Sequence, residues 1–457
     1  MRRGGGSGDA RIPATPGDLA AFAVRAVSDQ QLRVVLAFSG ALDAERLGEA
    51  TRLLTAAWPI LGCRLVLGPR PHWAQGARPA AGGVVETTDP VTALADVVAS
   101  SCDPRTGPVF DVRLVRASGE EREGATDTVC LRVDHAACDG VGAKELAYAL
   151  LGLYRALGEG SGARTCARVA AAWSPRRRSY LPILRAARVR DVARAAVLFP
   201  DHGARFRLPY DGRSRHEPRL AVARVDARRV ARVRAYGSAR GATLNDALLT
   251  AVFRALPAAD SAAGAGAPQA GAAGAGPDAA LRVLQMPIDL RPRQEIPAAE
   301  LPPANLAGLT FPTVRVTPDE PFDDTLRRVT AATRLAKSDV AALHIPAAFS
   351  LLFLLLGTQR GLGFIARELR DGHADGRSTP VFTNFGGLDA ARLRADRGVV
   401  LADAFVASPV IYPPALTVAA SEFAGALTLS SGSCAAAIEP SAIDGLLQAV
   451  AGGLPAC

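Results

Sequence analysis

Residues 131–142 read LRVDHAACDGVG, and this stretch sets the interpretation of the whole chain. An apolar strand pattern ends at His135, and Asp139 precedes the pattern of an amphipathic helix. A histidine at the end of a strand can present its imidazole at a sheet edge or in a cleft, and neutral imidazole is the natural general base near neutral pH. Gly140 permits a tight turn and close backbone approach. The pattern therefore predicts a catalytic base in the bend between a strand and a helix.

Simpler interpretations fit the same residues. Asp139 could cap the helix that starts near Val141, which is typically worth about 1 kcal/mol. His135 could be a hydrogen-bonded structural histidine, and Cys138 could form a Cys–His dyad, although a small buried residue is the simpler role for it. The local pattern leaves these alternatives open.

Composition narrows the class of protein and its partners. The chain has 457 residues, of which 49% are hydrophobic, enough for a sizeable core in two or three domain-sized units. The net charge of +9 could attract phosphate-bearing ligands or acidic proteins. We expect no nucleic-acid partner, because no recognition motif occurs and the basic residues are not interleaved with aromatic ones. The run Arg176–Arg178 could dock an acidic carrier protein or belong to a solvated linker.

Several features favour a cytoplasmic protein. The seven cysteines include no CxxC pair, which is typical of reduced thiols, and the N-terminus lacks the apolar core of a secretory signal. The longest apolar run, 345–357, contains a proline and is too short to span a bilayer, so we expect a buried helix there and no membrane partner. Asp371, His373 and Asp375 alternate on a glycine-containing segment, which is more typical of a solvated turn than of a cation site, so we expect no metal.

The pattern of apolar and turn residues predicts four regions. They are a disordered tail over 1–18, an N-terminal lobe over 19–174, a crossover linker over 175–218, and a C-terminal lobe over 219–457 with a disordered Ala/Gly-rich insertion at 258–280. Periodicity predicts strands near 31–38, 64–67, 109–116, 128–133, 220–225, 281–288, 380–385, 399–406, 415–420 and 425–429, and helices near 43–58, 141–157, 227–240, 243–256, 322–336 and 443–450. A hairpin loop is expected over 118–127.

The segment DHAACDG at 134–140 resembles the HHxxxDG signature of the chloramphenicol acetyltransferase superfamily. This superfamily includes condensation domains of nonribosomal peptide synthetases, plant-type alcohol acyltransferases and stand-alone polyketide-associated acyltransferases. Further segments resemble those of the family in the expected order: WPILGCRL at 58–65, ATLNDALLTAVFRAL at 242–256, MPIDLRPR at 286–293 and TNFGGLD at 383–389. The resemblance covers roughly residues 20–452 and is greatest to the stand-alone bacterial members. It implies an α/β fold of two similar lobes, each a mixed sheet with packed helices, which form a V around a central tunnel.

The resemblance also implies an activity. A stand-alone acyltransferase of this kind moves an acyl group from a thioester, on coenzyme A or on a carrier protein supplied in trans, to a hydroxyl or amine of a specialised metabolite. His135 would act as general base, commonly worth about 10²–10⁴-fold in rate. Thr383, Asn384 and the backbone N–H of Gly140 are candidate oxyanion donors, each worth about 3–4 kcal/mol. No permanently bound cofactor is implied, because coenzyme A or phosphopantetheine arrives as part of the donor.

In the family the motif aspartate is chiefly structural and pairs with an arginine. Arg64 occupies the matching position in WPILGCRL, so we predict an ion pair between Asp139 and Arg64, and we expect Arg291 to be structural or near the tunnel mouth. Asp134 replaces the first motif histidine. Because neighbouring strand residues point to opposite faces, Asp134 should contact buried polar groups or an arginine behind the strand.

Two features bear on the branch and on the activity. The DFGWG segment of the plant-type branch is absent, which argues against that branch. Because Asp134 replaces the first motif histidine, the chain could also be a catalytically silent condensation-like protein that binds a carrier protein. A condensation-fold enzyme that catalyses cyclisation, dehydration or epimerisation also stays open.

Overall fold

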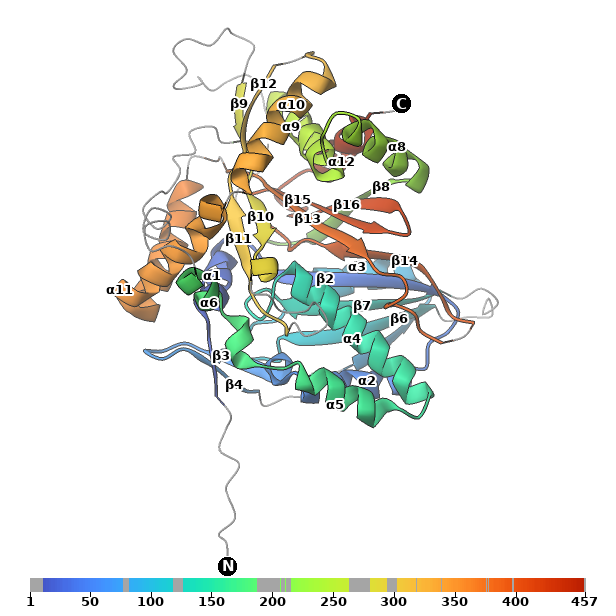
Figure 1. Ribbon diagram of the computed structural model, residues 1–457. Helices are drawn as coiled ribbons and strands as arrows, with labels where there is room; N and C mark the ends of the chain where they lie inside the picture. The colour runs from blue at the N-terminus through green and yellow to red at the C-terminus, as the bar shows by residue number, and fades with distance from the viewer. Residues whose placement is uncertain are drawn as a thin grey trace, which may run out of the picture.

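A computed structural model of the chain describes most of its length as a mixed α/β protein (Figure 1). The described residues are 11–76, 82–117, 126–186, 206, 210, 215–262, 280–293, 302–317, 319–337, 339–374, 376, 378–396 and 398–455. The predicted hairpin loop falls largely on 118–125, and most of the predicted insertion falls on 263–279. Both of these segments lie outside the described residues, as do residues 1–10.

The N-terminal lobe is built on a five-stranded sheet with the order β14-β2-β7-β6-β5. Its strands are β2 (Gln31–Ser39), β5 (Gly82–Thr87), β6 (Phe110–Ala117), β7 (Thr126–Asp134) and β14 (Val400–Ala407). The central strand β7 runs antiparallel to β2 and to β6, and its last residue, Asp134, lies opposite Gln31. The motif therefore begins at the end of the middle strand of this sheet.

Helices cover both faces of this sheet. They are α2 (Ala44–Ala57), α4 (Gly140–Gly158) and α5 (Gly162–Ala171) on one face and α3 (Pro90–Ala99) on the other. Alternation along β7 places Val129, Leu131 and Val133 in the core under α4, and Cys130 in a smaller cluster with Val98 of α3.

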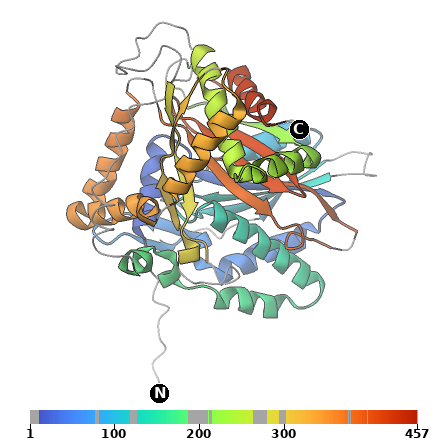
Figure 2. The same cartoon turned by 45° about the horizontal axis from the view of Figure 1, so that its top comes forward.

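The C-terminal lobe is built on a four-stranded mixed sheet with the order β13-β15-β16-β8. Its strands are β8 (Pro218–Val225), β13 (Val381–Leu388), β15 (Thr417–Phe423) and β16 (Ala426–Cys434). The helices of this lobe are α8 (Ala227–Ser238), α9 (Leu244–Ala262), α10 (Phe322–Ala336) and α12 (Pro440–Gly452). Figures 1 and 2 show the four helices gathered over this sheet, beyond which lies the sheet of the N-terminal lobe.

Short strands complete the structure. They are β1 (Ile12–Pro13), β3 (Cys63–Val66) and β4 (His72–Gln75) in one small sheet, β10 (Met286–Asp289) with β11 (Ala307–Thr310), and β9 (Ala280–Val283) with β12 (Thr313–Val316). The strand expected over 281–288 is therefore two strands, β9 and β10, which pair with different partners.

The structure corrects two predicted boundaries. Strand β14 comes from the segment assigned to the C-terminal lobe, yet it pairs with β2 and forms an edge of the N-terminal sheet. The disordered tail was predicted to reach residue 18, but β1 pairs with β4 and helix α1 (Pro16–Ala23) is capped by Thr15 and Asp18. In both cases the position of the segment is decided by strand pairing with residues that are distant in the sequence. The local composition does not predict such pairing.

The predicted linker contributes a buried residue. The 3-10 helix η3 (Pro175–Arg178) and helix α6 (Leu181–Ala186) occupy its beginning. Arg178 is fully buried, so this arginine is not part of a solvated linker or of an exposed docking patch. Residues 187–205 lie outside the described residues.

Helix α11 (Asp339–Gly372) differs most from its prediction. It bends at Gly357, whose φ of 70° and ψ of 176° are non-helical, and it packs against α1. Leu354 and Leu355 are 79% and 71% exposed, so the prediction of a buried helix over 345–357 is wrong. By length and composition alone, the segment Ala342–Gly372 could cross a membrane, and a third of its most apolar window is buried.

Candidate active site

The motif histidine follows directly from the end of β7. The backbone N–H of His135 donates to the carbonyl of Gln30 at 2.7 Å, and its side chain is partly exposed. Its Nδ1 lies 3.2 Å from Oδ1 of Asn305, a 6%-exposed residue on the segment that leads into β11. A side chain 170 positions away along the chain therefore sets the direction of the imidazole.

The contacts of Asn305 determine which nitrogen of His135 carries the proton. The Nδ2 atom of Asn305 donates to the carbonyl of Ala136 at 3.0 Å and to the carboxylate of Asp18 at 3.2 Å. Because both partners can only accept, this orientation of the amide turns its oxygen toward His135. Nδ1 of His135 must then donate, and in the neutral imidazole this leaves Nε2 without a proton. In this tautomer Nε2 can accept a proton.

Asp18 connects this arrangement to the rest of the lobe. Its carboxylate is fully buried and accepts from Arg178 at 3.0 Å and from Nε1 of Trp73 at 3.0 Å. Arg178 also donates to the carbonyl of Ala137 at 3.1 Å. The turn after His135 is thus held by buried polar groups that the sequence analysis did not identify. No spacing signal could have found them, because they come from three distant segments.

Asp139 pairs with Arg291, which corrects the predicted pair with Arg64. The two Asp139 oxygens lie 2.8 and 2.9 Å from the guanidinium of Arg291, whose side chain is 3% exposed. Arg64 lies on β3 with an exposed side chain. The side chain of Arg64 therefore stays hydrated at the surface. The segment after β10 instead brings Arg291 to the motif, where it is buried beside Asp139.

The carboxylate of Asp139 has every acceptor position in use. Besides Arg291, it accepts from the backbone N–H of Gly142 at 3.0 Å, which caps α4, and from that of Leu306 at 2.8 Å. Burial by itself would raise the pKa of Asp139, but the charge and hydrogen bonds of Arg291 outweigh it and hold the pKa below its ordinary value. A carboxylate occupied in this way is a structural anchor with no capacity left to relay a proton.

Asp134 lies behind β7, away from the face of α4. It is fully buried, and its carboxylate accepts from Arg25 at 2.7 Å, Gln31 at 2.8 Å and the N–H of Ala136 at 2.9 Å. Burial raises the pKa of Asp134 to about 7, against the opposing effect of Arg25 and the other donors. The predicted contact with an arginine and buried polar groups is confirmed.

Gly140 meets a side chain of the other lobe. A Cβ at this position would overlap the ring of Phe385, which comes from β13 and is buried. Lys144 of α4 donates to the carbonyl of Phe385, and burial lowers the pKa of Lys144. The start of α4 is therefore packed against β13 and hydrogen-bonded to it. The N–H of Gly140 at the first helical position has no intrahelical acceptor, as expected for a helix N-terminus.

Thr383 and Asn384 lie on the same strand, β13. Asn384 is exposed, and its amide donates to Oδ1 of Asn245 at 3.1 Å and accepts from the N–H of Gly386 at 2.9 Å. Thr383 is partly exposed and shares the strand face of Phe385, two positions on. The structure brings this strand to the start of α4, and the oxyanion role of the two residues stays a prediction.

The candidate thiol nucleophile and the candidate cation site have different surroundings from His135. Cys138 is fully buried, and burial raises the pKa of its thiol well above the ordinary value, so the Cys–His dyad lacks an accessible thiolate. Asp371 pairs with Arg367 at 3.1 Å. Asp375 lies outside the described residues, among which no cluster of three potential metal ligands occurs.

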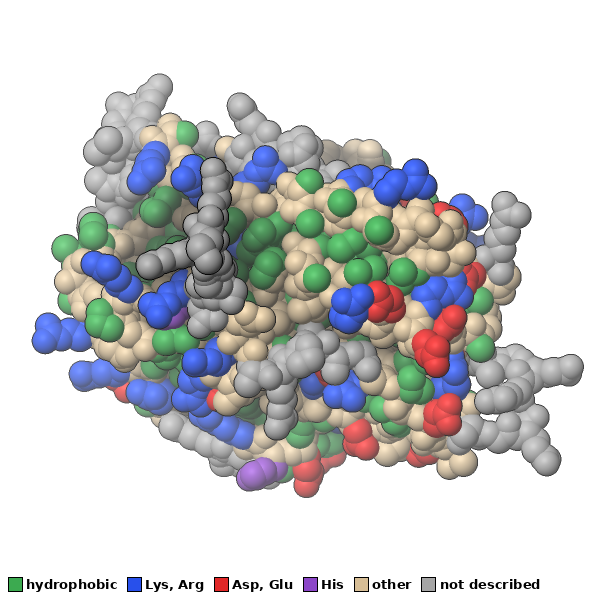
Figure 3. All heavy atoms as spheres, turned by 90° about the horizontal axis from the view of Figure 1, so that it is seen from below, with side chains coloured by type: hydrophobic (Ala, Val, Ile, Leu, Met, Phe, Trp, Pro, Cys, Tyr) green, Lys and Arg blue, Asp and Glu red, His purple; other side chains and the backbone are tan. Residues whose placement is uncertain are grey.

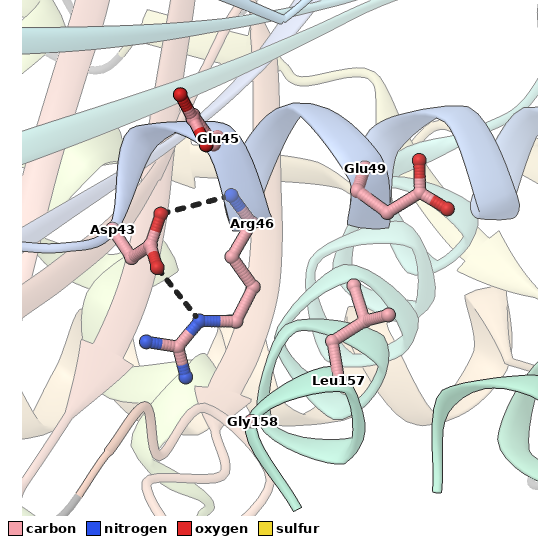
Figure 4. Close-up of a pocket in the computed structure, with 6 residues that line it drawn as sticks. All are labelled: Asp43, Glu45, Arg46, Glu49, Leu157 and Gly158. Carbon is pink, nitrogen blue, oxygen red and sulfur yellow. Dashed lines mark hydrogen bonds and ion pairs between the residues drawn. The ribbon is translucent and has the colours of Figure 1, made fainter. Parts of the chain in front are cut away.

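An open surface hollow lies far from His135. Figure 4 shows it between the start of α2 and the end of α4, lined by Asp43, Glu45, Arg46, Glu49, Leu157 and Gly158. His135 precedes the start of α4, and a helix of 19 residues is about 28 Å long. This hollow is therefore no part of the His135 site, and the central tunnel implied by the resemblance stays a prediction.

Comparisons with known proteins identify the fold. No protein-family model matches the sequence, and neither does any curated protein. Among solved structures, a trichothecene 15-O-acetyltransferase from Fusarium sporotrichioides is similar over 97% of this chain and 94% of that one, with a TM-score of 0.66 at 12% identity. The first condensation domain of the calcium-dependent antibiotic synthetase, in complex with a substrate analogue, is similar over 97% and 95%, with a TM-score of 0.63 at 17% identity.

A third solved structure shares the same architecture. Polyketide synthase associated protein 5 from Mycobacterium tuberculosis is similar over 98% of both chains, with a TM-score of 0.60 at 16% identity. These similarities extend over nearly the full length of each protein. The chain therefore has the same two-lobed α/β fold as these acetyltransferase, condensation-domain and polyketide-synthase-associated structures.

Proposed function

We propose that this protein is an acyltransferase that moves an acyl group from a thioester to a hydroxyl or amine of a specialised metabolite. The observation that carries the proposal is the partly exposed His135 whose Nδ1 is engaged by Asn305, which leaves Nε2 free to accept a proton. Fold similarity to an acetyltransferase and a condensation domain supports the same class of chemistry.

The proposed reaction needs one base and one oxyanion site. Nε2 of His135 removes the proton of the acceptor O–H or N–H as the acceptor oxygen or nitrogen bonds to the thioester carbonyl carbon. The tetrahedral intermediate carries its negative charge on the former carbonyl oxygen. Collapse breaks the C–S bond, and the imidazolium returns its proton to the leaving thiolate. General base catalysis of this kind is commonly worth about 10²–10⁴-fold.

The start of α4 and β13 supply candidate donors for the oxyanion. Thr383 and the backbone N–H of Gly140 are the stronger candidates. Asn384 is the weaker one, because its amide already bonds Asn245 and the N–H of Gly386. Each well-aimed donor is worth about 3–4 kcal/mol of transition-state stabilisation.

The acyl donor is proposed to be acyl-coenzyme A or an acyl carrier protein supplied in trans, with the thioester arm as the transient cofactor. Among the solved structures of the same fold are a condensation domain and a polyketide synthase associated protein, which supports carrier proteins as one class of partner. We also propose cytoplasmic residence, where such thioesters are made. The six described cysteines are all free, which suits that location.

The test measures acyl transfer by intact-mass spectrometry, with panels of acyl-coenzyme A and acyl carrier protein donors and of alcohol and amine acceptors. The wild-type protein should add an acyl mass to an acceptor, and His135→Ala should slow that transfer by at least about 100-fold. Arg64→Ala serves as control, because Arg64 is exposed and lies outside the motif network.

The alternatives give different results in the same assay. A carrier protein that binds to the wild-type chain without any transfer would support a catalytically silent partner protein. A product that keeps its thioester but loses water would support cyclisation or dehydration. A thioester of unchanged mass whose released acid shows inverted stereochemistry by chiral chromatography would support epimerisation. Transfer at the wild-type rate by His135→Ala would overturn the proposed base.

A further inference from the structure

Helix α11 carries an exposed apolar ridge. Leu351, Leu354 and Leu355 are 40%, 79% and 71% exposed, and their spacing of i, i+3 and i+4 places them on one face. Leu356 is 40% exposed, and no Asp, Glu, Lys or Arg occurs from position 342 to position 359. Soluble proteins rarely expose a contiguous group of large apolar side chains without a role for it.

Packing on both sides of the bend fixes the orientation of the helix, and on the first arm Leu352 and Phe353 are partly buried against the cluster that contains Leu19. After the bend at Gly357, Leu362 and Ile365 are 8% and 6% exposed and pack against Leu19 and Ala23 of α1. Figures 1 and 2 show the two arms of α11 at the outer edge of the molecule. The packing against α1 therefore holds the leucine ridge toward the outside of the molecule. The ridge lies at the end of the first arm, next to the bend.

Basic residues accompany the ridge. On the second arm Arg360, Phe364 and Arg367 follow one another at i, i+4 and i+7, and all three are exposed. The ion pair of Arg367 with Asp371 is exposed on both sides, so it costs little to exchange for another anion. Figure 3 shows hydrophobic and basic side chains intermixed at the end of the molecule where α11 lies, on the left.

We infer that the bend of α11 docks on a membrane surface that contains anionic phospholipids. The leucines of the first arm would enter the boundary between headgroups and acyl chains, and the arginines of the second arm would contact lipid phosphates. The net charge of +9 would add long-range attraction to such a surface. This inference reverses the expectation of no membrane contact, which depended on a buried helix over 345–357.

Two observations favour a lipid surface over a protein partner. Leucine is under-represented among residues that dominate protein interfaces, and the exposed Arg360 and Arg367 on the second arm match anionic headgroups. The bend and the packing against α1 also favour a helix lying on the membrane over one that crosses it.

Vesicle co-sedimentation of the full chain tests the inference. Wild type should sediment with vesicles of phosphatidylcholine containing about a third phosphatidylglycerol, and much less with phosphatidylcholine alone. Leu354→Ser/Leu355→Ser should lower the partition coefficient at least about tenfold, because two exposed leucines lose their apolar transfer. Arg360→Gln/Arg367→Gln should remove most of the preference for anionic vesicles.

The matched control is Val91→Ser/Val400→Ser, which replaces two exposed apolar side chains away from α11, 81% and 62% exposed. It should bind vesicles like wild type. Equal binding by the double leucine variant, or no binding of wild type to anionic vesicles, would overturn the inference. A third result would also overturn it: wild type that binds no vesicles but self-associates, with the self-association abolished by the leucine substitutions. In that case a second copy of the chain would cover the ridge. His135→Ala should bind vesicles normally, so this test is independent of acyl transfer.

Discussion

The two ends of the motif loop are anchored by similar residues in different ways. Asp134 and Asp139 flank His135, both are buried, and each pairs with an arginine. Asp139 meets Arg291, which comes from the chain beyond β10, is 3% exposed and bonds both carboxylate oxygens. Asp134 meets Arg25 of its own lobe, whose side chain is 23% exposed and which bonds one oxygen.

The contrast shows that burial alone does not set the charge of a carboxylate. The pKa of Asp139 is held below its ordinary value, whereas that of Asp134 is raised to about 7. The difference follows from the partner, because a fully enclosed bidentate arginine compensates lost hydration better than a partly solvated, single contact. The pair at the start of α4 also connects distant parts of the chain, so it should contribute more to holding the site together.

The largest effect should come from Arg291→Ala. It would leave the buried Asp139 without its counter-charge, and breaking a buried pair in this way typically costs about 3–5 kcal/mol. Urea unfolding followed by circular dichroism measures the free energy of unfolding. Arg64→Ala is the control and should stay within about 0.5 kcal/mol of wild type, as surface substitutions usually do. Equal losses in the two variants would mean that Asp139 does not depend on Arg291.

A smaller loss is expected from Arg25→Ala. Asp134 would keep its bonds from Gln31 and from the N–H of Ala136, and a hydrogen bond to a charged group contributes about 1.5–3 kcal/mol. The same unfolding experiment checks it. If this variant lost more stability than Arg291→Ala, the proposed ranking of the two anchors would be wrong.

A third prediction concerns the pH dependence of stability. Because the pKa of Asp134 is raised from 3.8 to about 7, the folded state binds its proton more tightly than the unfolded state does. The contribution of this group to stability is greatest below about pH 4 and is lost as the pH rises through 7. Asp134→Asn removes this titration, so the slope of stability between pH 5 and 8 should change by at most about 1.4 kcal/mol per pH unit.

Asp139→Asn provides the contrast for that experiment. The pKa of Asp139 is lowered, so its contribution to stability is present above the unfolded value of 3.8 and is lost only as the pH falls further. Between pH 5 and 8 this variant should therefore be destabilised by a constant amount. Unfolding curves at four pH values between 5 and 8 would distinguish the two variants. If the free energy of unfolding depended on pH in the same way in both variants, the assigned pKa shifts of Asp134 and Asp139 would be contradicted.

Much of the site was predictable because it is local. The strand that ends at Asp134, the helix that starts at Gly140 and the histidine between them follow from period-2 and period-3.6 patterns within about 30 residues. The partners were not predictable in the same way. Arg291 lies 152 positions from Asp139, and Asn305 lies 170 positions from His135, so no spacing rule connects them.

Helix α11 illustrates a second kind of limit. Its apolar sequence correctly indicated a helix, and the choice between buried and exposed depended on whether another element covers it. Hydropathy measures the tendency of a side chain to leave water, and it carries no information on whether the fold supplies a partner surface. The same limit explains why β14 was assigned to the lobe of its sequence neighbours.

The sequence by itself determined the local elements and the position of the histidine in its bend, because each of these depends on residues close along the chain. It also determined the resemblance to a two-lobed acyltransferase family, because short local motifs follow one another in the family's order. Only the tertiary structure decided that Arg291 pairs with Asp139, that Asn305 orients His135, and that the leucines of α11 face outward. The physical reason is that charge pairing, tautomer choice and exposure depend on which distant segments the fold brings within a few ångströms of one another.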